Sequence, residues 1–214
     1  MSGIGVSARG VTQRFGYQVA LDPLDLELEP GDRLAVLGPN GAGKTSLLRI
    51  LATAARPAGG ELEIGGLDAL RRRSEARRLV GYVGHEPSLY PALTALENVE
   101  FFARLHGLGR PEALRALGRV GLSALGARPA ADLSRGLLQR LALARSLVHE
   151  PAFWVLDEPD ASLDAEGRDL LAELAASRTV VLATHDTDLA LWLCRRTLLL
   201  RNGGVERPAL EAVR

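Results

Sequence analysis

The sequence predicts an α/β domain with a mostly parallel core sheet, a small antiparallel β subdomain and an inserted helical lobe. Short apolar runs at 34–37, 153–156 and 180–183 are separated by helical segments, as in a parallel sheet that helices cover on both faces. Near the N-terminus, 5–11 and 24–29 alternate apolar and polar residues, which is typical of half-buried antiparallel strands. These two patterns indicate one domain built from two kinds of sheet.

The first half of the chain is predicted to hold strands and one helix, separated by turn residues. Gly16 and Pro23 are expected to interrupt the N-terminal strands. Beyond them the predicted order is a turn at 30–32, the buried strand 34–37, a helix over 45–55 and short strands at 61–64 and 79–83.

The segment 87–150 has a helical pattern that is broken where glycines occur. The breaks fall at 107–109, at 121 and at 126–129. A last apolar strand is predicted at 198–200. We therefore treat 1–214 as a single domain, in which 1–86 and 151–214 form the core with its β subdomain and 87–150 forms the helical lobe.

The composition favours a folded protein of balanced charge. Hydrophobic residues make up 47% of the 214 residues, and 26 basic residues balance 26 acidic ones, which gives no argument for nucleic acid as a partner. The N-terminus lacks a basic segment followed by an apolar run, and no apolar run reaches the roughly 18 residues that span a bilayer. A cytoplasmic location is therefore expected. The single cysteine, Cys194, is predicted to be a buried thiol.

One segment, 70–79, is locally basic and contains five arginines. Basic runs at helical spacing are usually solvated helix faces, and this is the interpretation that we adopt. The alternative is a surface that faces lipid headgroups or a partner.

The most specific motif lies between the predicted strand 34–37 and the predicted helix 45–55. It matches the P-loop pattern G-x-x-x-x-G-K-[ST], in which glycines let backbone N–H groups converge on phosphates at a helix N-terminus. Lys44, the only lysine of the chain, is expected to bridge the β- and γ-phosphates of ATP, and the Thr45 hydroxyl to ligate Mg²⁺. The predicted phosphate-binding residues are Gly38, Pro39, Asn40, Gly41, Ala42, Gly43, Lys44, Thr45 and Ser46.

A second motif places two adjacent carboxylates at the end of the apolar strand 153–156. Ligands of open α/β sheets bind at the carboxyl ends of the strands. Asp157 is predicted to hold Mg²⁺ through water, and Glu158 to orient or deprotonate the water that attacks the γ-phosphate. Strands often end in an acidic residue that caps a helix, so this motif becomes specific only beside the P-loop.

Together these motifs resemble those of the nucleotide-binding subunits of ATP-binding cassette (ABC) transporters, over essentially the whole chain. The segment 133–140 resembles the signature of that family. In the family, two subunits pack head to tail, and ATP lies between the P-loop of one and the signature of the other. The resemblance implies a homodimer with ATP in which these signature residues act on the partner's nucleotide: Ser134, Arg135, Gly136 and Leu137.

Three further positions match the family in chain order. The segment 161–164 resembles the D-loop and ends at Asp164. His185 follows the strand 180–183 and resembles the switch histidine, which senses the γ-phosphate. Phe15 stands where the family has its adenine-stacking aromatic residue, and Tyr17 is the alternative.

The chain departs from the family pattern at two places. Arg135 and Leu137 replace the first Gly and the Gln of the usual L-S-G-G-Q signature, and His85 replaces the glutamine of the Q-loop. Because Ser134 and the other catalytic positions remain, an active ATPase is expected, with Glu158, His185 and His85 as its catalytic residues. The segments around His85 and the signature are similar to the haem-exporter ATP-binding subunit of c-type cytochrome maturation, which implies that role.

Two other functions stay open at the level of sequence. An ABC exporter ATPase for drugs or lipids shares every catalytic motif, and an iron–sulfur assembly ATPase is not excluded by the length of the chain. For a transporter, the resemblance implies ATP and Mg²⁺ as ligands and separate transmembrane permease subunits as partners. Those subunits would hold the chain at the inner face of the cell membrane.

Overall fold

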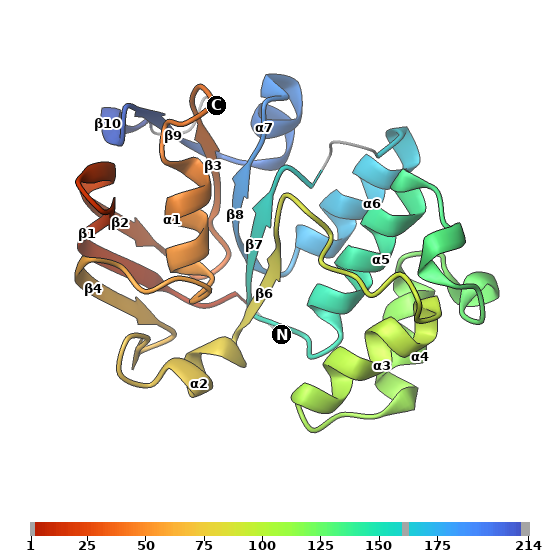
Figure 1. Cartoon of the computed structure of the whole chain (residues 1–214). Helices are drawn as coiled ribbons and strands as arrows, with labels where there is room; N and C mark the ends of the chain where they lie inside the picture. Colours follow the sequence, from red (N-terminus) through yellow and green to blue (C-terminus); the bar gives the residue numbers. More distant parts are fainter. Residues whose placement is uncertain (1–2, 160–162, 211–214) are drawn as a thin grey trace.

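The core of the molecule is a six-stranded sheet with the strand order β10-β9-β3-β8-β7-β6 (Figure 1). The structure, a computed structural model, describes residues 3–159 and 163–210, with side chains described through Glu206. All strand pairs are parallel except β9 with β10. The strands are β3 (Arg33–Leu37), β6 (Val80–Val83), β7 (Phe153–Asp157), β8 (Thr179–Ala183), β9 (Arg196–Arg201) and β10 (Gly204–Leu210). The predicted fold class is confirmed.

A second, antiparallel sheet has the order β2-β1-β4-β5. Its strands are β1 (Val6–Phe15), β2 (Gln18–Leu28), β4 (Gly59–Ile64) and β5 (Leu67–Asp68). Gly16 lies in the turn between β1 and β2 as predicted, whereas the prediction that Pro23 interrupts a strand was wrong. β2 is an edge strand with irregular register, so the N–H that proline lacks is not needed for pairing there.

One helix, α1 (Lys44–Leu51), packs between the two sheets. Its leucines share a hydrophobic cluster with residues of β1, β2, β3 and β7. α1 ends at Leu51 and not at Ala55, because the next backbone N–H groups turn back to the carbonyls of Ile50 and Arg49. The basic segment forms only a five-residue helix, α2 (Arg73–Arg77), beyond the end of α1.

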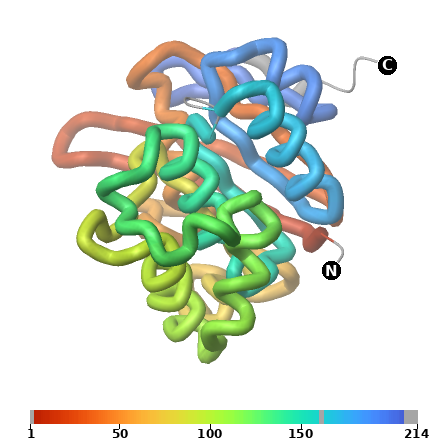
Figure 2. The backbone as a smooth tube through the Cα atoms, turned by 90° about the vertical axis from the view of Figure 1, so that its right-hand side faces the viewer, coloured from red at the N-terminus to blue at the C-terminus, as the bar shows by residue number. Residues whose placement is uncertain are grey.

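The helices of 87–150 gather at one end of the molecule (Figures 1 and 2). They are α3 (Ala95–Leu105), α4 (Arg110–Arg119), two short 3₁₀ turns (Ser123–Leu125 and Ala130–Asp132) and α5 (Arg135–Leu147). The predicted glycine breaks all fall between these helices. Two more helices, α6 (Ala165–Ala175) and α7 (Thr187–Leu193), alternate with β8 and β9. No helix among the described residues has the length and apolar character to cross a membrane. The domain boundaries at 86–87 and 150–151 stay a prediction.

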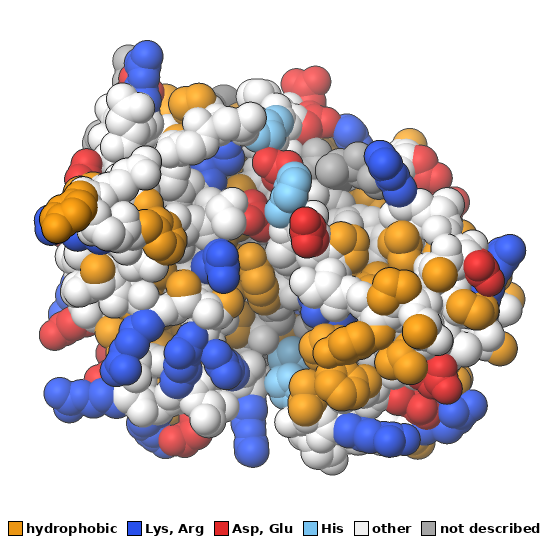
Figure 3. All heavy atoms as spheres, in the orientation of Figure 1, with side chains coloured by type: hydrophobic (Ala, Val, Ile, Leu, Met, Phe, Trp, Pro, Cys, Tyr) orange, Lys and Arg blue, Asp and Glu red, His pale blue; other side chains and the backbone are white. Residues whose placement is uncertain are grey.

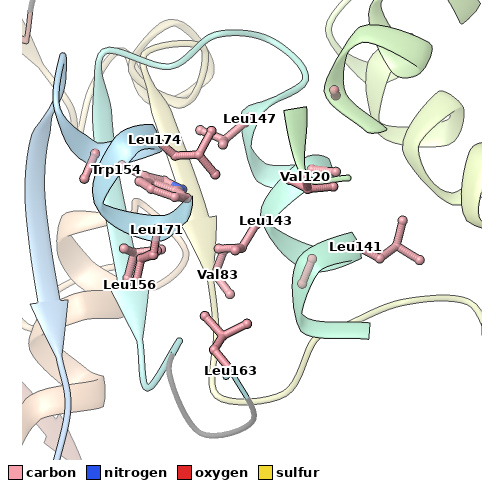
Figure 4. Packing of buried hydrophobic residues seen from close by; sticks show 14 of the residues in the cluster. Val83, Val120, Leu141, Leu143, Leu147, Trp154, Leu156, Leu163, Leu171 and Leu174 are labelled. Carbon is pink, nitrogen blue, oxygen red and sulfur yellow. The ribbon is translucent and has the colours of Figure 1, made fainter. Parts of the chain in front are cut away.

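Alternation along β7 divides its side chains between the two faces of the core sheet. Phe153 and Val155 join the cluster on the α1 side, whereas Trp154 and Leu156 join the cluster formed with α3 to α7. Figure 4 shows Trp154 beside leucines of α5 and α6. Its indole N–H donates to Ser146 Oγ at 3.0 Å, which satisfies a donor that is fully buried. By the same alternation, residue 157 faces the α1 side.

In the C-terminal hairpin, β9 contains the strand predicted at 198–200, whereas the turn that follows and β10 were not predicted. Asn202 and Gly203 have φ values of +51° and +85°, as the tight turn between β9 and β10 requires. Gly203 donates to Ala42 O at 3.1 Å and accepts from Asp22 N at 2.9 Å. The turn therefore ties the Gly-rich loop to the antiparallel sheet.

Cys194, at the end of α7, is 5% exposed, and burial raises the pKa of its thiol to about 12, as expected for an inert core residue.

A pair of stacked histidines joins the helical lobe to the core sheet and predicts acid sensitivity. The rings of His106 and His149 lie 3.8 Å apart at 7°, and His149 Nε2 is 3.1 Å from Val80 O. Burial, followed by repulsion from His106, lowers the pKa of His149 to about 4. In the unfolded chain His149 has the ordinary histidine pKa of about 6.5, so the unfolded chain binds a proton at pH values where the folded chain does not. The free energy of unfolding therefore falls as the pH drops from about 6.5 toward 4.

We expect the His149→Gln variant to be less acid-sensitive than the parent chain. Between pH 7.5 and 5 the free energy of unfolding of the parent should fall by about 2 kcal/mol more than that of the variant. The glutamine amide can still donate to Val80 O but does not titrate. Urea unfolding of both proteins at the two pH values measures the difference, and equal losses would contradict the prediction.

Candidate functional site

The Gly-rich loop between β3 and α1 has a backbone that only glycine can follow. Gly38, Gly41 and Gly43 have φ values of +146°, +77° and +101°. A Cβ at Gly38 would lie 2.2 Å from Leu200 O, and one at Gly43 would lie 2.6 Å from Ala20 O. α1 begins directly after Gly43 without a side-chain cap, so its first N–H groups are free to bind an anion.

Lys44 lies inside this loop rather than in solvent. Its side chain is 6% exposed, and Nζ donates to Gly38 O at 2.7 Å and to Pro39 O at 3.1 Å. The two carbonyls hold the ammonium group over the loop, where the motif predicts the phosphates. The flat, forked guanidinium of arginine does not fill the same place as a compact ammonium.

Asp157 ends β7 at the carboxyl edge of the sheet and faces α1, as the strand alternation requires. It is 1% exposed, and a hydrogen bond with Thr45 connects it to the first turn of α1. Burial raises the pKa of its carboxyl group; the Thr45 bond and the charges of His85 and Lys44 oppose this rise, and the nearby Glu158 adds to it. Oδ2 of Asp157 is buried with no hydrogen-bond partner among the described residues.

These residues fit a magnesium ion. A buried carboxylate oxygen without a partner is costly unless a cation or water satisfies it. Mg²⁺ prefers oxygen ligands and binds through one or two protein groups together with substrate phosphates. Asp157 and Thr45 would hold the ion beside the phosphate loop, where it would neutralise charge on the phosphates.

Glu158 is held between two imidazoles just beyond β7. His85 Nδ1 lies 3.0 Å from its Oε2, and His185 Nε2 lies 3.0 Å from its Oε1. The Glu158 backbone has a φ of +53° and its N–H donates to Ala183 O on β8 at 2.8 Å. Histidine and acidic side chains adjoin on this face of the molecule (Figure 3). Both histidines predicted to be catalytic thus contact Glu158, although the three residues come from three segments of the chain.

The signature segment lies at the start of α5, on the far side of the core sheet from α1 (Figure 1). Ser134 caps this helix, and its Oγ accepts from Leu137 N at 3.4 Å. Among the described residues, no hydrogen bond or ion pair joins 134–137 to the phosphate loop. Within one chain, the signature and the P-loop therefore form separate sites.

The matching family model is that of the ABC transporter and covers residues 21–161. The chain belongs to the ABC transporter family. It is 39% identical over 192 residues to the daunorubicin resistance ATP-binding protein DrrA3 of Streptomyces coeruleorubidus, which covers 86% of this chain and 61% of that protein. It is 41% identical over 209 residues to the aliphatic sulfonates import ATP-binding protein SsuB 3 of Rhodococcus jostii, which covers 95% and 74%.

Solved ABC structures have the same fold over nearly the whole chain. The dimeric, post-hydrolysis ATP-binding cassette MJ0796 with ADP and Pi superimposes with a TM-score of 0.87 at 30% identity, covering 96% of this chain and 98% of that one. Some curated relatives are longer: this chain spans 61% of DrrA3 and 63% of the Fe(3+) ions import ATP-binding protein FbpC of Rhizobium etli, to which it is 38% identical over 224 residues, or 97% of its own length.

The remaining predicted residues lie at the start of α6 and at the hairpin of β1 and β2. Asp164 caps α6: its Oδ1 accepts from Gly167 N at 2.9 Å, and this bond, ahead of Arg140, lowers the pKa of Asp164. Of the predicted D-loop, Ala161 and Ser162 lie outside the described residues. Phe15 ends β1 and Tyr17 lies in the turn that follows; they are 61% and 107% exposed. Both are accessible to a base, so the choice of Phe15 stays a prediction.

Two polar residues that support the ABC site were missed. Asn98 of α3 is fully buried and exchanges hydrogen bonds with Tyr90 N and Tyr90 O, which fixes the segment that follows His85. Gln139 of α5 donates to Pro159 O at 2.8 Å, next to Glu158. The Asn98 position had no distinguishing pattern in sequence; Gln139 lay within the signature helix, but nothing showed which backbone carbonyl it would reach.

Proposed function

We propose that this chain binds Mg-ATP, hydrolyses it and thereby energises an ABC transporter. The observation that carries the proposal is the arrangement at the end of β7, where Asp157 faces Thr45 and Glu158 lies between His85 and His185. A buried carboxylate can hold the metal, and an accessible one can receive a proton from water. An imidazole on each Glu158 oxygen restricts the orientation of that carboxylate.

The proposed catalytic unit is a head-to-tail homodimer. Ser134 and the free N–H groups at the start of α5 form an anion-binding end that is separate from the phosphate loop of the same chain. A second copy could bring this end to the nucleotide, and the similar cassette MJ0796 is dimeric. Permease subunits in the membrane would be the further partners, and would hold the chain at the inner face of the cell membrane.

Dimerisation gives a direct test of this proposal. With Glu158→Gln and Mg-ATP, light scattering should show a dimer, and without nucleotide mostly a monomer. In the parent chain, the ATPase rate per subunit should rise with protein concentration, because each site needs a second copy. A monomer that hydrolyses ATP at a rate independent of concentration would contradict the proposal.

His85 offers a test of the arrangement around Glu158. A glutamine amide can donate to Glu158 Oε2 as His85 does, so His85→Gln should keep ATP turnover within about twofold. His85→Ala removes one hydrogen bond that positions the carboxylate, and turnover should fall by up to about tenfold. Steady-state ATPase assays on the purified proteins measure both. Equal rates for the parent and both variants would leave His85 without a role in hydrolysis.

The identity of the transported molecule is a separate proposal. The resemblance around His85 and the signature supports a haem-exporter-type complex of cytochrome c biogenesis. The relatives reported above are named for drug resistance, sulfonate import and iron import, and DrrA3 favours drug export as the second candidate. The neighbouring reading frames test the choice: a small membrane protein beside cytochrome-maturation factors supports haem export, and a drug-type permease contradicts it.

A further inference from the structure

Arginines gather around the end of α1, away from the ATP site. Arg73 and Arg77 are one turn apart on α2, and both reach the backbone carbonyl of Thr53. Arg73 donates from Nε and Nη2 at 2.9 and 2.7 Å, and Arg77 from Nη2 at 3.3 Å. Figure 3 shows basic side chains collected over this part of the molecule.

These arginines are not paired with acidic side chains in the part of the chain that the structure describes. Among the described residues, neither Arg56, Arg73 nor Arg77 forms an ion pair, whereas the neighbouring Arg71 and Arg72 pair with Asp68 and Glu75. Burial lowers the pKa of Arg73, and the charges of Arg77 and Arg56 lower it further. Each guanidinium carries five N–H donors, and Thr53 O accepts only three of those on Arg73 and Arg77.

A cavity of about 40 Å³ lies in the same place. Its polar lining is Thr53, Arg56 and Arg73, and its apolar lining includes Leu62 and Leu70. Thr53 is 2% exposed, and its Oγ1 is buried with no hydrogen-bond partner among the described residues. A wider recess of about 450 Å³ shares Arg56, Leu62 and Leu70 with the cavity. Its lining also includes basic residues and the carboxylates of Glu61, Glu63 and Asp68.

We infer that Arg56, Arg73, Arg77 and Thr53 form a second anion site, which binds a phosphate group whose remaining part extends into the wider recess. Guanidinium groups bind phosphate through two parallel N–H donors, and these three arginines, which form no ion pair among the described residues, retain donors for such an anion. The Thr53 hydroxyl supplies a neutral donor from the cavity wall. Both a soluble phosphate ester and a phospholipid headgroup contain such a phosphate group.

The test measures phosphate binding with the ATP site filled by a non-hydrolysable ATP analogue. One arm titrates inorganic phosphate and glycerol 3-phosphate by calorimetry, and the other measures sedimentation with phosphatidylglycerol vesicles. Binding in the soluble arm assigns the site to a small phosphate, and binding to vesicles alone assigns it to a lipid headgroup. Absence of binding in both arms would overturn the inference.

Two variants distinguish phosphate binding at this specific site from a general effect of positive surface charge. Arg56 makes no hydrogen bond among the described residues, so Arg56→Gln should fold normally, keep its ATPase rate and bind phosphate about tenfold more weakly. Arg78→Gln makes the same change of charge at a residue that does not line the cavity, and should change affinity less than about twofold. Equal losses of phosphate affinity in the two variants would contradict the inference of a specific site.

Thr53→Val tests the hydroxyl separately. It removes an oxygen that has no hydrogen-bond partner among the described residues, so stability should not fall, while phosphate affinity should drop severalfold. Unchanged affinity in this variant would remove Thr53 from the site.

Discussion

The Glu158→Gln variant should turn over ATP about 10²- to 10⁴-fold more slowly than the parent chain, the usual contribution of a general base. The amide has the shape of the carboxylate but cannot accept the proton of the attacking water. It can still pair with the two imidazoles, since it offers a donor on one side and an acceptor on the other. Nucleotide affinity should be retained or increased, because one negative charge near the phosphates is removed.

Three measurements make this result interpretable. Single-turnover hydrolysis gives the rate, calorimetry with Mg-ATP gives the affinity, and thermal unfolding shows that the fold is intact. Glu173→Gln is a matched control, since it makes the same chemical change on the exposed face of α6. Near-parent turnover of the Glu158 variant would contradict its assignment as the base, and a simultaneous loss of ATP affinity would indicate a binding role instead.

The Lys44→Ala variant should bind ATP at least about 100-fold more weakly, since two charge-assisted contacts to phosphate oxygens are lost. Stability should change little, because the residues whose carbonyls lose the ammonium are not buried: Gly38 is half-buried and Pro39 is exposed. Lys44→Arg keeps the charge but should still impair binding: the ammonium now contacts both carbonyls at short range, and a planar fork does not fit there.

Calorimetric titration with Mg-ATP and Mg-ADP measures both Lys44 variants. Arg49→Ala, which removes a positive charge from the exposed last turn of the same helix, should bind nucleotide like the parent. Tight ATP binding by both Lys44 variants would refute the assignment of the loop as the phosphate site.

The sequence predicted the core strands and the P-loop because each has a local cause. Apolar runs mark β7 and β8, and the glycines at 38, 41 and 43 mark a backbone with positive φ. The contact of Glu158 with His85 and His185 was expected only through the family resemblance, since nothing local shows that residues 73 and 27 positions away along the chain meet Glu158.

Other features depend on distant contacts and could not be read from periodicity. Helical spacing predicted that α1 continues to Ala55, but Thr53 adopts a φ of +55° while Arg73 and Arg77 bind its carbonyl. Pro23 lies in a strand because that strand is at an edge. The turn at Asn202 and Gly203 did carry a local signal, since Asn-Gly favours a tight hairpin, and it was overlooked.

α5 is hydrogen-bonded at two points to β7 and to the segment that follows it. Ser134 caps its first turn, Gln139 holds the carbonyl of Pro159, and Ser146 accepts from Trp154 inside β7. An α-helix rises 1.5 Å per residue and its backbone is hydrogen-bonded along its whole length. It therefore moves largely as a stiff rod when one end is displaced. In the proposed dimer, a displacement of the capped end by the second subunit would pass through the helix and the Gln139 hydrogen bond to the residue after Glu158, which would couple the two nucleotide sites.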